Sequence, residues 1–332
     1  MLYETEYPQV YSNSNIVLDI LRRPIVWFKP LLTSLGQLLL YRVKIKPFEL
    51  KCASELFDKK IIKMDDGSEI LIATNEPTSK PIAVVLYLHT VCGNYTQLAH
   101  IGDMLKGDNL VYITYTRSGN DSSLSFSKFN FVGRTEELEV VVRYISLRYP
   151  NIPIHAIGAS AGSALLIRYL SKCNSNKLIK SAALISPGYN FMKSCENMNA
   201  ISKAYLVNKM KYMVRGLDCK QELRSVRTLN DWVGFQSKLL GYDSQEEYIL
   251  DCDPVHHIHN INVPTLCVSA LDDSVFDGGI TKEFLNLPFI NRNIMLVVTK
   301  RGGHVMFEDH GHKRSWFLRV THEWLKNRIG YK

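Results

Sequence analysis

A serine between two glycines stands at the junction of two stretches with different patterns. The pentapeptide Gly-Ala-Ser-Ala-Gly at 158–162 directly follows the apolar run Ile154 to Ile157 and directly precedes an apolar helical pattern. On a tight strand-to-helix turn the serine is strained, and glycine neighbours let other backbone approach it without a Cβ clash. The amino terminus of the helix directs backbone N–H groups toward an oxyanion beside Ser160. We therefore interpret Ser160 as a nucleophile, with an ordinary glycine-rich turn as the alternative.

Two groups that can assist a serine follow later expected strands. A serine hydroxyl needs a base to take its proton, and that base needs an acid to orient it. The expected strand Pro264 to Leu271 leads into Asp272 and Asp273, and the expected strand Ile294 to Thr299 leads to His304. Because the carboxyl ends of parallel strands meet at one edge of a sheet, these side chains can converge there. The residues alone do not separate the two aspartates, and the alternative for either is a solvated loop carboxylate.

The loop after the expected strand Ile82 to His89 is the candidate source of a second oxyanion donor. We expect the backbone amides of Val91 and Ala161 to stabilise the negative charge that develops beside the serine. Loss of one such donor typically raises the barrier by about 3 kcal/mol. His89 itself is expected only to brace this loop.

Apolar runs and helical patterns alternate along most of the chain. Ile82 to His89 is a near-continuous β-branched and apolar run, typical of a strand buried on both faces of a parallel sheet. Similar runs follow at Leu110 to Thr116, Ile154 to Gly158, Ala182 to Ser186, Pro264 to Leu271 and Ile294 to Thr299. Phe57 to Met64 and Glu69 to Ala73 predict two further strands joined by a turn. Helical patterns at Glu136 to Tyr149 and Ala161 to Ser171 predict an α/β fold: a mostly parallel eight-stranded sheet flanked by helices.

One connection is much longer than the others. More than 70 residues between Pro187 and Val263 contain no convincing strand and are rich in apolar residues at helical spacing. A structureless loop of that length would be abnormal, so we predict a helical cap insertion over 188–263. Its apolar set could line an acyl-chain channel, but we expect most members to form the core of the insertion: Phe191, Met192, Met198, Tyr205, Leu206, Met210, Met213, Trp232, Phe235, Leu239 and Leu240. The core then consists of 57–187 and 264–332.

Residues 1–56 are expected to form a helical extension. Leu31, Leu32, Leu35, Leu38 and Leu39 fall on one helical face, and basic residues flank that face. The apolar run is shorter than the roughly 20 residues that a membrane span requires. We favour a helix packed on the domain, and a helix lying on a membrane surface is the alternative.

Composition limits the class of protein and its partners. The 332 residues are 46% hydrophobic and 22% charged, which is typical of a globular protein. The net charge of +8 is spread along the chain without a basic block or a nucleic-acid motif, so no nucleic-acid partner is expected. Seven scattered cysteines without a Cys-x-x-Cys pattern predict reduced thiols in a cytoplasmic setting. The first 20 residues do not resemble a secretory signal.

These motifs together resemble the α/β-hydrolase superfamily, and more narrowly its type-4 branch of medium-chain acyl-ester hydrolases and monoacylglycerol-type lipases. The similarity covers about 57–325, and its motifs are the serine pentapeptide, Arg117-Ser118-Gly119, Thr135-Glu136-Glu137-Leu138, Gly241-Tyr242, Glu246-Glu247-Tyr248, Asp253-Pro254, Ile261-Asn262-Val263-Pro264, Leu271-Asp272-Asp273 and Gly302-Gly303-His304. In that family the second acid of the Asp-Asp pair is the triad member, so the resemblance implies Asp273. Thr90 stands where the family's oxyanion loop usually carries glycine.

The resulting hypothesis is a serine hydrolase that cleaves small-molecule acyl esters through Ser160, His304 and Asp273 and an acyl-enzyme intermediate. It needs no cofactor and no metal. Transfer of the acyl group to an alcohol or thiol, and a catalytically silent binding protein on the same fold, are the alternatives. A metal site is disfavoured because the available histidines lack helical spacing and a nearby acid: His256, His257, His259, His310 and His312. The sequence does not define acyl length, leaving group or oligomeric state.

Overall fold

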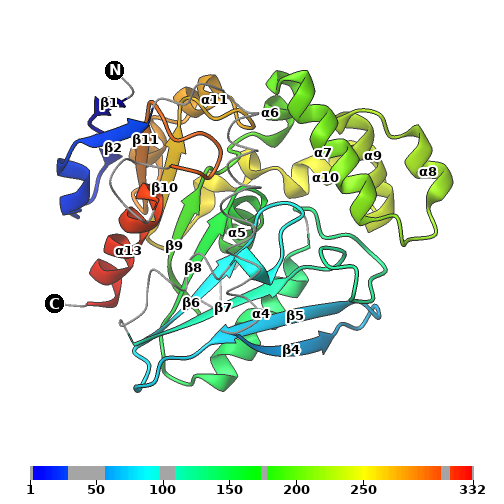
Figure 1. Cartoon of the computed structure of the whole chain (residues 1–332), viewed down its shortest axis with the longest axis horizontal. Helices are drawn as coiled ribbons and strands as arrows, with labels where there is room; N and C mark the ends of the chain where they lie inside the picture. The colour runs from blue at the N-terminus through cyan, green and yellow to red at the C-terminus, as the bar shows by residue number, and fades with distance from the viewer. Residues whose placement is uncertain are drawn as a thin grey trace.

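The computed structural model describes residues 3–28, 57–97, 109–132, 134–172, 178–307 and 315–330. Within these ranges, nine strands form one sheet in the order β2-β11-β10-β9-β8-β6-β7-β5-β4 (Figure 1). The six strands from β11 to β7 in that order run parallel, and β2, β4 and β5 add antiparallel pairings at the two edges. The strands are β2 (Gln9–Ser12), β4 (Asp58–Lys63), β5 (Glu69–Asn75), β6 (Ala83–Leu88), β7 (Leu110–Thr116), β8 (Ile154–Ala159), β9 (Ile179–Ile185), β10 (Thr265–Ala270) and β11 (Ile294–Thr299).

Apolar side chains cover both faces of the central strands, which explains why those strands lack a polar alternation. In β6, Val84, Leu86 and Leu88 join one buried cluster, whereas Val85 and Tyr87 join the other. Successive side chains of a strand point to opposite faces, so a strand between two helical layers must be apolar at every position. The helices that supply those layers are α4 (Thr135–Arg148) and α5 (Ala161–Lys172) on one face and α13 (Trp316–Ile329) on the other.

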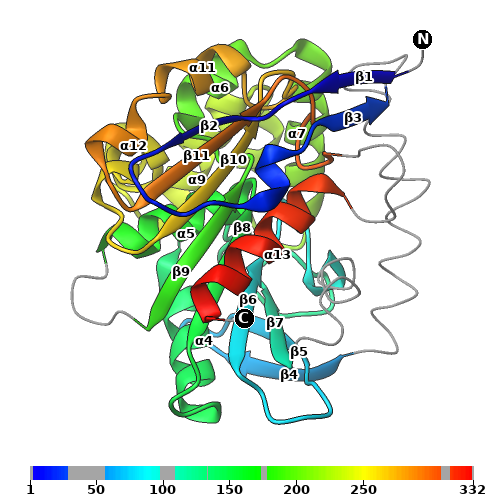
Figure 2. The ribbon, with the colours of Figure 1, turned by 90° about the vertical axis from the view of Figure 1, so that its left-hand side faces the viewer.

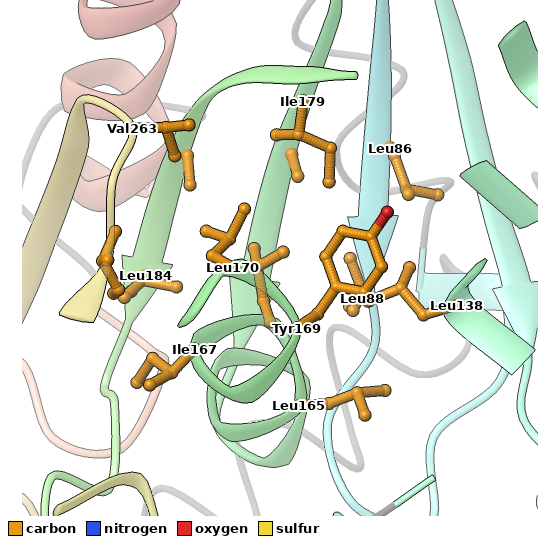
Figure 3. Close-up of a cluster of buried hydrophobic side chains, with 14 of the residues drawn as sticks. Leu86, Leu88, Leu138, Leu165, Ile167, Tyr169, Leu170, Ile179, Leu184 and Val263 are labelled. Carbon is orange, nitrogen blue, oxygen red and sulfur yellow. The ribbon is translucent and has the colours of Figure 1, made fainter. Parts of the chain in front are cut away.

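The two layers can be followed in the figures. Figure 2 shows α13 crossing one face of the sheet and β2 running beside β11. Figure 3 shows part of the layer on the other face, where Leu165 and Tyr169 of α5 lie in the same cluster as Leu88 of β6. Burial of this helix on the sheet fixes the position of its first residue, which directly follows Ser160.

The described residues between β9 and β10 form a series of helices, and Figure 1 shows the first of them beside the carboxyl edge of the sheet. Those helices are α6 (Phe191–Asn197), α7 (Ala200–Met213), α8 (Lys220–Ser225), α9 (Leu229–Leu240), α10 (Gln245–Cys252), η4 (Pro254–His256) and η5 (Ile258–Asn260). Helix α9 begins with a capping box between Thr228 and Asp231 and ends at Gly241, whose φ is 84°. Short helices α11 (Gly278–Glu283) and α12 (Leu287–Ile290) follow β10.

The insertion packs onto the core through a third apolar cluster. This cluster joins Trp232 and Met210 of the insertion to Phe129, Ala161 and Ala164 of the core. Phe129 and Trp232 meet edge to face with ring centroids 5.8 Å apart. The insertion therefore lies against the beginning of α5, next to the serine.

The N-terminal part differs from our expectation. We predicted eight strands and a helical extension over 1–56, but residues 3–28 contain β1 (Tyr3–Glu6), β2, the 3-10 helix η1 (Asp19–Arg22) and β3 (Ile25–Phe28). Strand β2 is the ninth strand because it pairs with the backbone groups that β11 would otherwise leave open at the sheet edge. Strands of four residues are too short to be recognised from the hydrophobic periodicity of the sequence.

The apolar helical face at 31–39 lies outside the described residues. Within the part of the chain that the structure describes, no helix is long and apolar enough to cross a membrane.

Candidate active site

Ser160 occupies the tight turn between β8 and α5. Its φ is 54°, a left-handed conformation that is unusual for a residue with a side chain. Its amide donates to the Ile185 carbonyl of the neighbouring strand at 2.9 Å, and its own carbonyl accepts the Ser163 amide at 2.8 Å. The sheet and the first turn of the helix thus hold the strained backbone from both sides.

The two glycines of the pentapeptide are required by close backbone contacts. A Cβ on Gly158 would lie 2.7 Å from the Gly162 carbonyl oxygen and from the Ser163 Cα. A Cβ on Gly162 would lie 2.8 Å from the His89 carbonyl oxygen and closer still to that of Leu88. Real Cβ atoms do not make such contacts, so only glycine lets α5 approach both β8 and the end of β6.

The structure brings Ser160, His304 and Asp273 together in one hydrogen-bonded chain. Nε2 of His304 lies 2.8 Å from Oγ of Ser160, and Nδ1 of His304 lies 2.9 Å from Oδ2 and 3.1 Å from Oδ1 of Asp273. Because a carboxylate only accepts hydrogen bonds, Nδ1 carries the hydrogen and Nε2 accepts from the serine hydroxyl. This is the arrangement that activates a serine as a nucleophile.

Asp273 is itself fixed by the backbone that follows it. Its Oδ1 accepts the amides of Val275 at 2.8 Å and Phe276 at 2.9 Å. The Phe276 ring meets the His304 imidazole edge to face at 5.1 Å. The Asp273 side chain is 3% exposed and that of His304 is 18% exposed, so their hydrogen bond is largely shielded from water.

The neighbouring Asp272 has a different partner. Its Oδ1 accepts the amide of Gly303 at 2.8 Å, one residue before His304. Burial raises the pKa of the Asp272 carboxyl, although the bond from Gly303 acts in the opposite direction. Asp272 therefore holds the loop that carries the histidine, while Asp273 holds the histidine itself.

The loop after β6 is held by a buried arginine. The Arg117 guanidinium donates to the carbonyls of Thr90 at 2.8 Å, His89 at 3.1 Å and Phe131 at 3.2 Å. The Thr90 side chain exchanges hydrogen bonds with Gln97, and the positive φ in this loop, 54°, falls on Cys92. A β-branched Thr90 is therefore compatible with a loop in which the family usually carries glycine, because Thr90 does not adopt the left-handed conformation.

His89 braces the same loop. It is fully buried, its Nδ1 donates to the Thr90 carbonyl at 2.8 Å, and its Nε2 accepts the Arg117 amide at 3.3 Å. Burial and the charge of Arg117 hold the pKa of His89 well below its ordinary value, so the imidazole is neutral. This side chain supports the backbone and does not join the Ser160 chain.

Ala161 belongs to the third apolar cluster, beside the serine, and the Val91 side chain packs against that cluster. Ala161 is the first residue of α5, and the first amides of a helix have no acceptor within that helix. A trans peptide points its C=O and N–H in opposite directions, and no peptide of the described chain is cis. The Thr90 carbonyl accepts from Arg117, from Nδ1 of His89 and from the Gly93 amide, and these three bonds together fix the Thr90–Val91 peptide. Our sequence reasoning did not give Arg117 a part in this loop.

Two of the remaining histidine candidates have structural partners. His257 contacts the Asp251 carbonyl at 2.9 Å and Ser171 Oγ at 3.2 Å, and His259 stacks on Phe284. Across the described ranges no group of three or more histidine, cysteine or acidic side chains could hold a metal ion. His310 and His312 lie outside those ranges.

Comparison with known proteins agrees with this architecture. No family model matches the chain. Phospholipase ABHD3 from Bos taurus is 25% identical over 286 residues, which cover 79% of this chain and 69% of that protein. Phospholipase ABHD3 from Homo sapiens is 30% identical over 186 residues, which cover 52% of this chain and 45% of that protein.

A solved structure decides the fold. The esterase Pf2001 of Pyrococcus furiosus superposes with a TM-score of 0.52 and 18% identity, covering 84% of this chain and 91% of that one. The chain has the α/β-hydrolase fold. As in the expected α/β-hydrolase order, the serine follows a central strand and the aspartate and histidine follow two later strands of this one sheet. The described helices α6 to α10 lie between β9 and β10 of this fold.

Proposed function

We propose that the protein is a serine hydrolase that cleaves carboxylic esters with an apolar, lipid-like acyl chain. The observation that carries the proposal is the position of the His304 imidazole, 2.8 Å from the Ser160 hydroxyl through Nε2 and 2.9 Å from the Asp273 carboxylate through Nδ1. Both distances are within hydrogen-bond reach, which is the geometric requirement for a general base.

In the proposed mechanism, Ser160 Oγ attacks the ester carbonyl while His304 Nε2 takes the hydroxyl proton. The amides of Val91 and Ala161 stabilise the negative charge on the tetrahedral oxygen. His304 then returns the proton to the leaving alcohol, and an acyl-enzyme on Ser160 remains. Water, deprotonated by the same imidazole, attacks the acyl-enzyme and releases the carboxylic acid. Asp273 keeps the imidazole oriented and stabilises its protonated form.

The surroundings of the serine support an apolar acyl group. Ser160 is only 3% exposed, and the apolar cluster at Ala161 continues through Val91, Phe191 and Met192. An acyl chain placed there replaces water with apolar contacts, whereas a charged group would lose its hydration without gaining a partner. The relatives named as phospholipases support a lipid ester as substrate.

A fluorophosphonate probe tests the proposal directly. Wild-type protein is expected to be labelled and to hydrolyse p-nitrophenyl esters, and Ser160→Ala is expected to do neither. Ser163→Ala is the matched control, since Ser163 Oγ donates to the Gly158 and Ile185 carbonyls and does not face His304. A folded wild-type protein that is neither labelled nor active on esters of several chain lengths would support a binding protein instead.

A further inference from the structure

The N-terminal residues approach the loop that carries His304. Strand β2 pairs antiparallel with β11 so that Gln9 lies opposite Val298. Continuing that register backward along the chain places Glu6 beside the first residues after β11, at the start of the His304 loop. Pro8 has no amide hydrogen and cannot extend the strand ladder between these two points.

At that position the Glu6 carboxylate, in place of a backbone carbonyl, accepts the backbone amides that follow β11. Its oxygens accept the Lys300 amide at 3.0 and 3.1 Å and the Arg301 amide at 3.3 Å. The indole N–H of Trp27 also donates to Oε1. Glu6 is only 7% exposed, and Trp27 is fixed by an edge-to-face contact with Trp316 of α13. A buried carboxylate that accepts from three donors is a rigid anchor for this backbone.

The anchored loop has an unusual conformation that needs external support. The φ angles are positive at Gly302 (145°), Gly303 (58°), Val305 (64°) and Phe307 (40°). For a β-branched residue such as Val305 this conformation is strained, and such strain persists only where the surroundings determine it. Polar groups from outside the loop hold its backbone at several points. The Glu6 carboxylate accepts at 300–301, Asp272 accepts at 303, Ser186 Oγ accepts at 305, and the Trp316 amide donates to the carbonyl of Phe307.

We propose that Glu6 is a positioning residue for His304, so that the N-terminal two-stranded sheet of β1 and β3 takes part in assembling the active site. Without the carboxylate the amides of Lys300 and Arg301 lose their acceptor, and the strained loop relaxes at its amino end. The imidazole then leaves the position in which it reaches both Ser160 and Asp273. This inference rests on the proposed catalytic role of His304.

Glu6→Gln tests the proposal with minimal change in shape. The side-chain amide nitrogen of the new glutamine cannot accept a hydrogen bond. It would face the N–H groups of Lys300, Arg301 or Trp27, which now donate to the carboxylate. Active sites are titrated with a fluorophosphonate, and kcat per titrated site is measured with a p-nitrophenyl ester. We expect kcat per site to fall by about tenfold to a hundredfold, since small misplacements of a catalytic group cost that much, while KM changes far less.

Glu4→Gln is the matched control from the same strand. The Glu4 carboxylate contacts the Arg301 side chain at 3.3 Å and does not hold the loop backbone. It is expected to keep kcat per site within about twofold, as exposed ion pairs contribute little. If Glu6→Gln only reduces the fraction of titrated sites or the melting temperature, with kcat per site unchanged, Glu6 is merely structural and the proposal is wrong.

Hydrogen–deuterium exchange gives a second measurement that does not need activity. In Glu6→Gln, exchange is expected to rise at Lys300 and Arg301 and across the peptide 300–307, but not in Glu4→Gln. Unchanged exchange there would overturn the proposal. If wild-type protein shows no ester hydrolysis and no labelling, the proposed function fails, while the exchange result still decides whether Glu6 holds the loop.

Discussion

Asp272 and Asp273 are neighbours in the chain, yet their carboxylates hold different parts of the same loop. Asp273 binds the His304 imidazole at 2.9 Å, and Asp272 binds the Gly303 amide at 2.8 Å. Both side chains come from the turn after β10, but only one reaches the ring. One carboxylate therefore orients the His304 imidazole, and the other supports the backbone beside it.

Asparagine substitutions at the two positions are expected to have unequal effects. Asp273→Asn removes the carboxylate that fixes the imidazole tautomer, and kcat should fall by about 10³- to 10⁴-fold. Asp272→Asn keeps an oxygen that accepts the Gly303 amide, so kcat should fall by less than about tenfold. Steady-state ester hydrolysis, corrected for titrated sites, measures both. A larger loss for Asp272→Asn than for Asp273→Asn would contradict this assignment and give the orienting role to Asp272.

Gly162→Ala is expected to damage both stability and activity. The added Cβ would press on the Leu88 and His89 carbonyl oxygens, which belong to the end of β6 and the loop that carries Val91. Overpacking of this kind costs about 1–3 kcal/mol of unfolding free energy, and displacement of the loop should lower kcat as well. Denaturant unfolding and ester turnover measure the two effects.

Gly216→Ala is the control for that substitution. A Cβ on Gly216 meets nothing within 4 Å, and its change in unfolding free energy should stay within about 0.5 kcal/mol. Equal stability of the two alanine variants would show that the backbone at Gly162 yields without strain.

Arg117→Lys is expected to lower kcat more than it changes KM. A lysine cannot donate in the planar fork that reaches the carbonyls of Thr90, His89 and Phe131. The Thr90 carbonyl then keeps only its bonds from His89 and Gly93, and the Val91 amide is held less firmly. Loss of one oxyanion donor reduces kcat by about 10²- to 10³-fold, which is the upper limit for this variant. Ester kinetics together with circular dichroism measure activity and folding.

Arg148→Lys is the comparison variant, because Arg148 binds Glu76 at 2.7 Å and is partly exposed. Its kcat should remain within about twofold of wild type. Matching kinetic losses in the two variants would mean that Arg117 has no special role in the loop.

His155 is expected to make the protein less stable as the pH falls. Burial, with a smaller effect from the charge of Arg328, lowers its pKa from 6.5 to about 4, while Nδ1 bonds Ser181 Oγ at 2.8 Å. In the unfolded chain His155 binds a proton near pH 6.5, whereas in the folded protein it binds one only near pH 4. This contribution to stability is therefore complete above pH 6.5 and is lost between the two values, by at most about 3 kcal/mol.

His155→Asn removes that titration. Unfolding free energies measured from pH 7 to pH 4 should fall less steeply for the variant than for wild type, whatever its stability at neutral pH. Parallel curves over this interval would contradict the assignment.

The central strands and their mostly parallel arrangement could be predicted because the relevant signals are local. The run that became β6 is apolar on both faces, and the serine pentapeptide directly joins β8 to α5. A strand buried on both sides must be apolar, and a turn this tight must contain glycine. The short strands of residues 3–28 carried no such pattern, and the expected helical extension was wrong for that stretch.

The sequence by itself determined which residue types are available for chemistry and at which strand ends they emerge. It named Ser160, His304 and the aspartate pair, and the resemblance chose Asp273. Only the tertiary structure decided that Asp272 binds Gly303, that Arg117 holds Thr90 and that Glu6 holds Lys300 and Arg301. These contacts join residues up to 295 positions apart, and hydrogen bonds of this range depend on how strands and loops pack, which leaves no periodic trace in the chain.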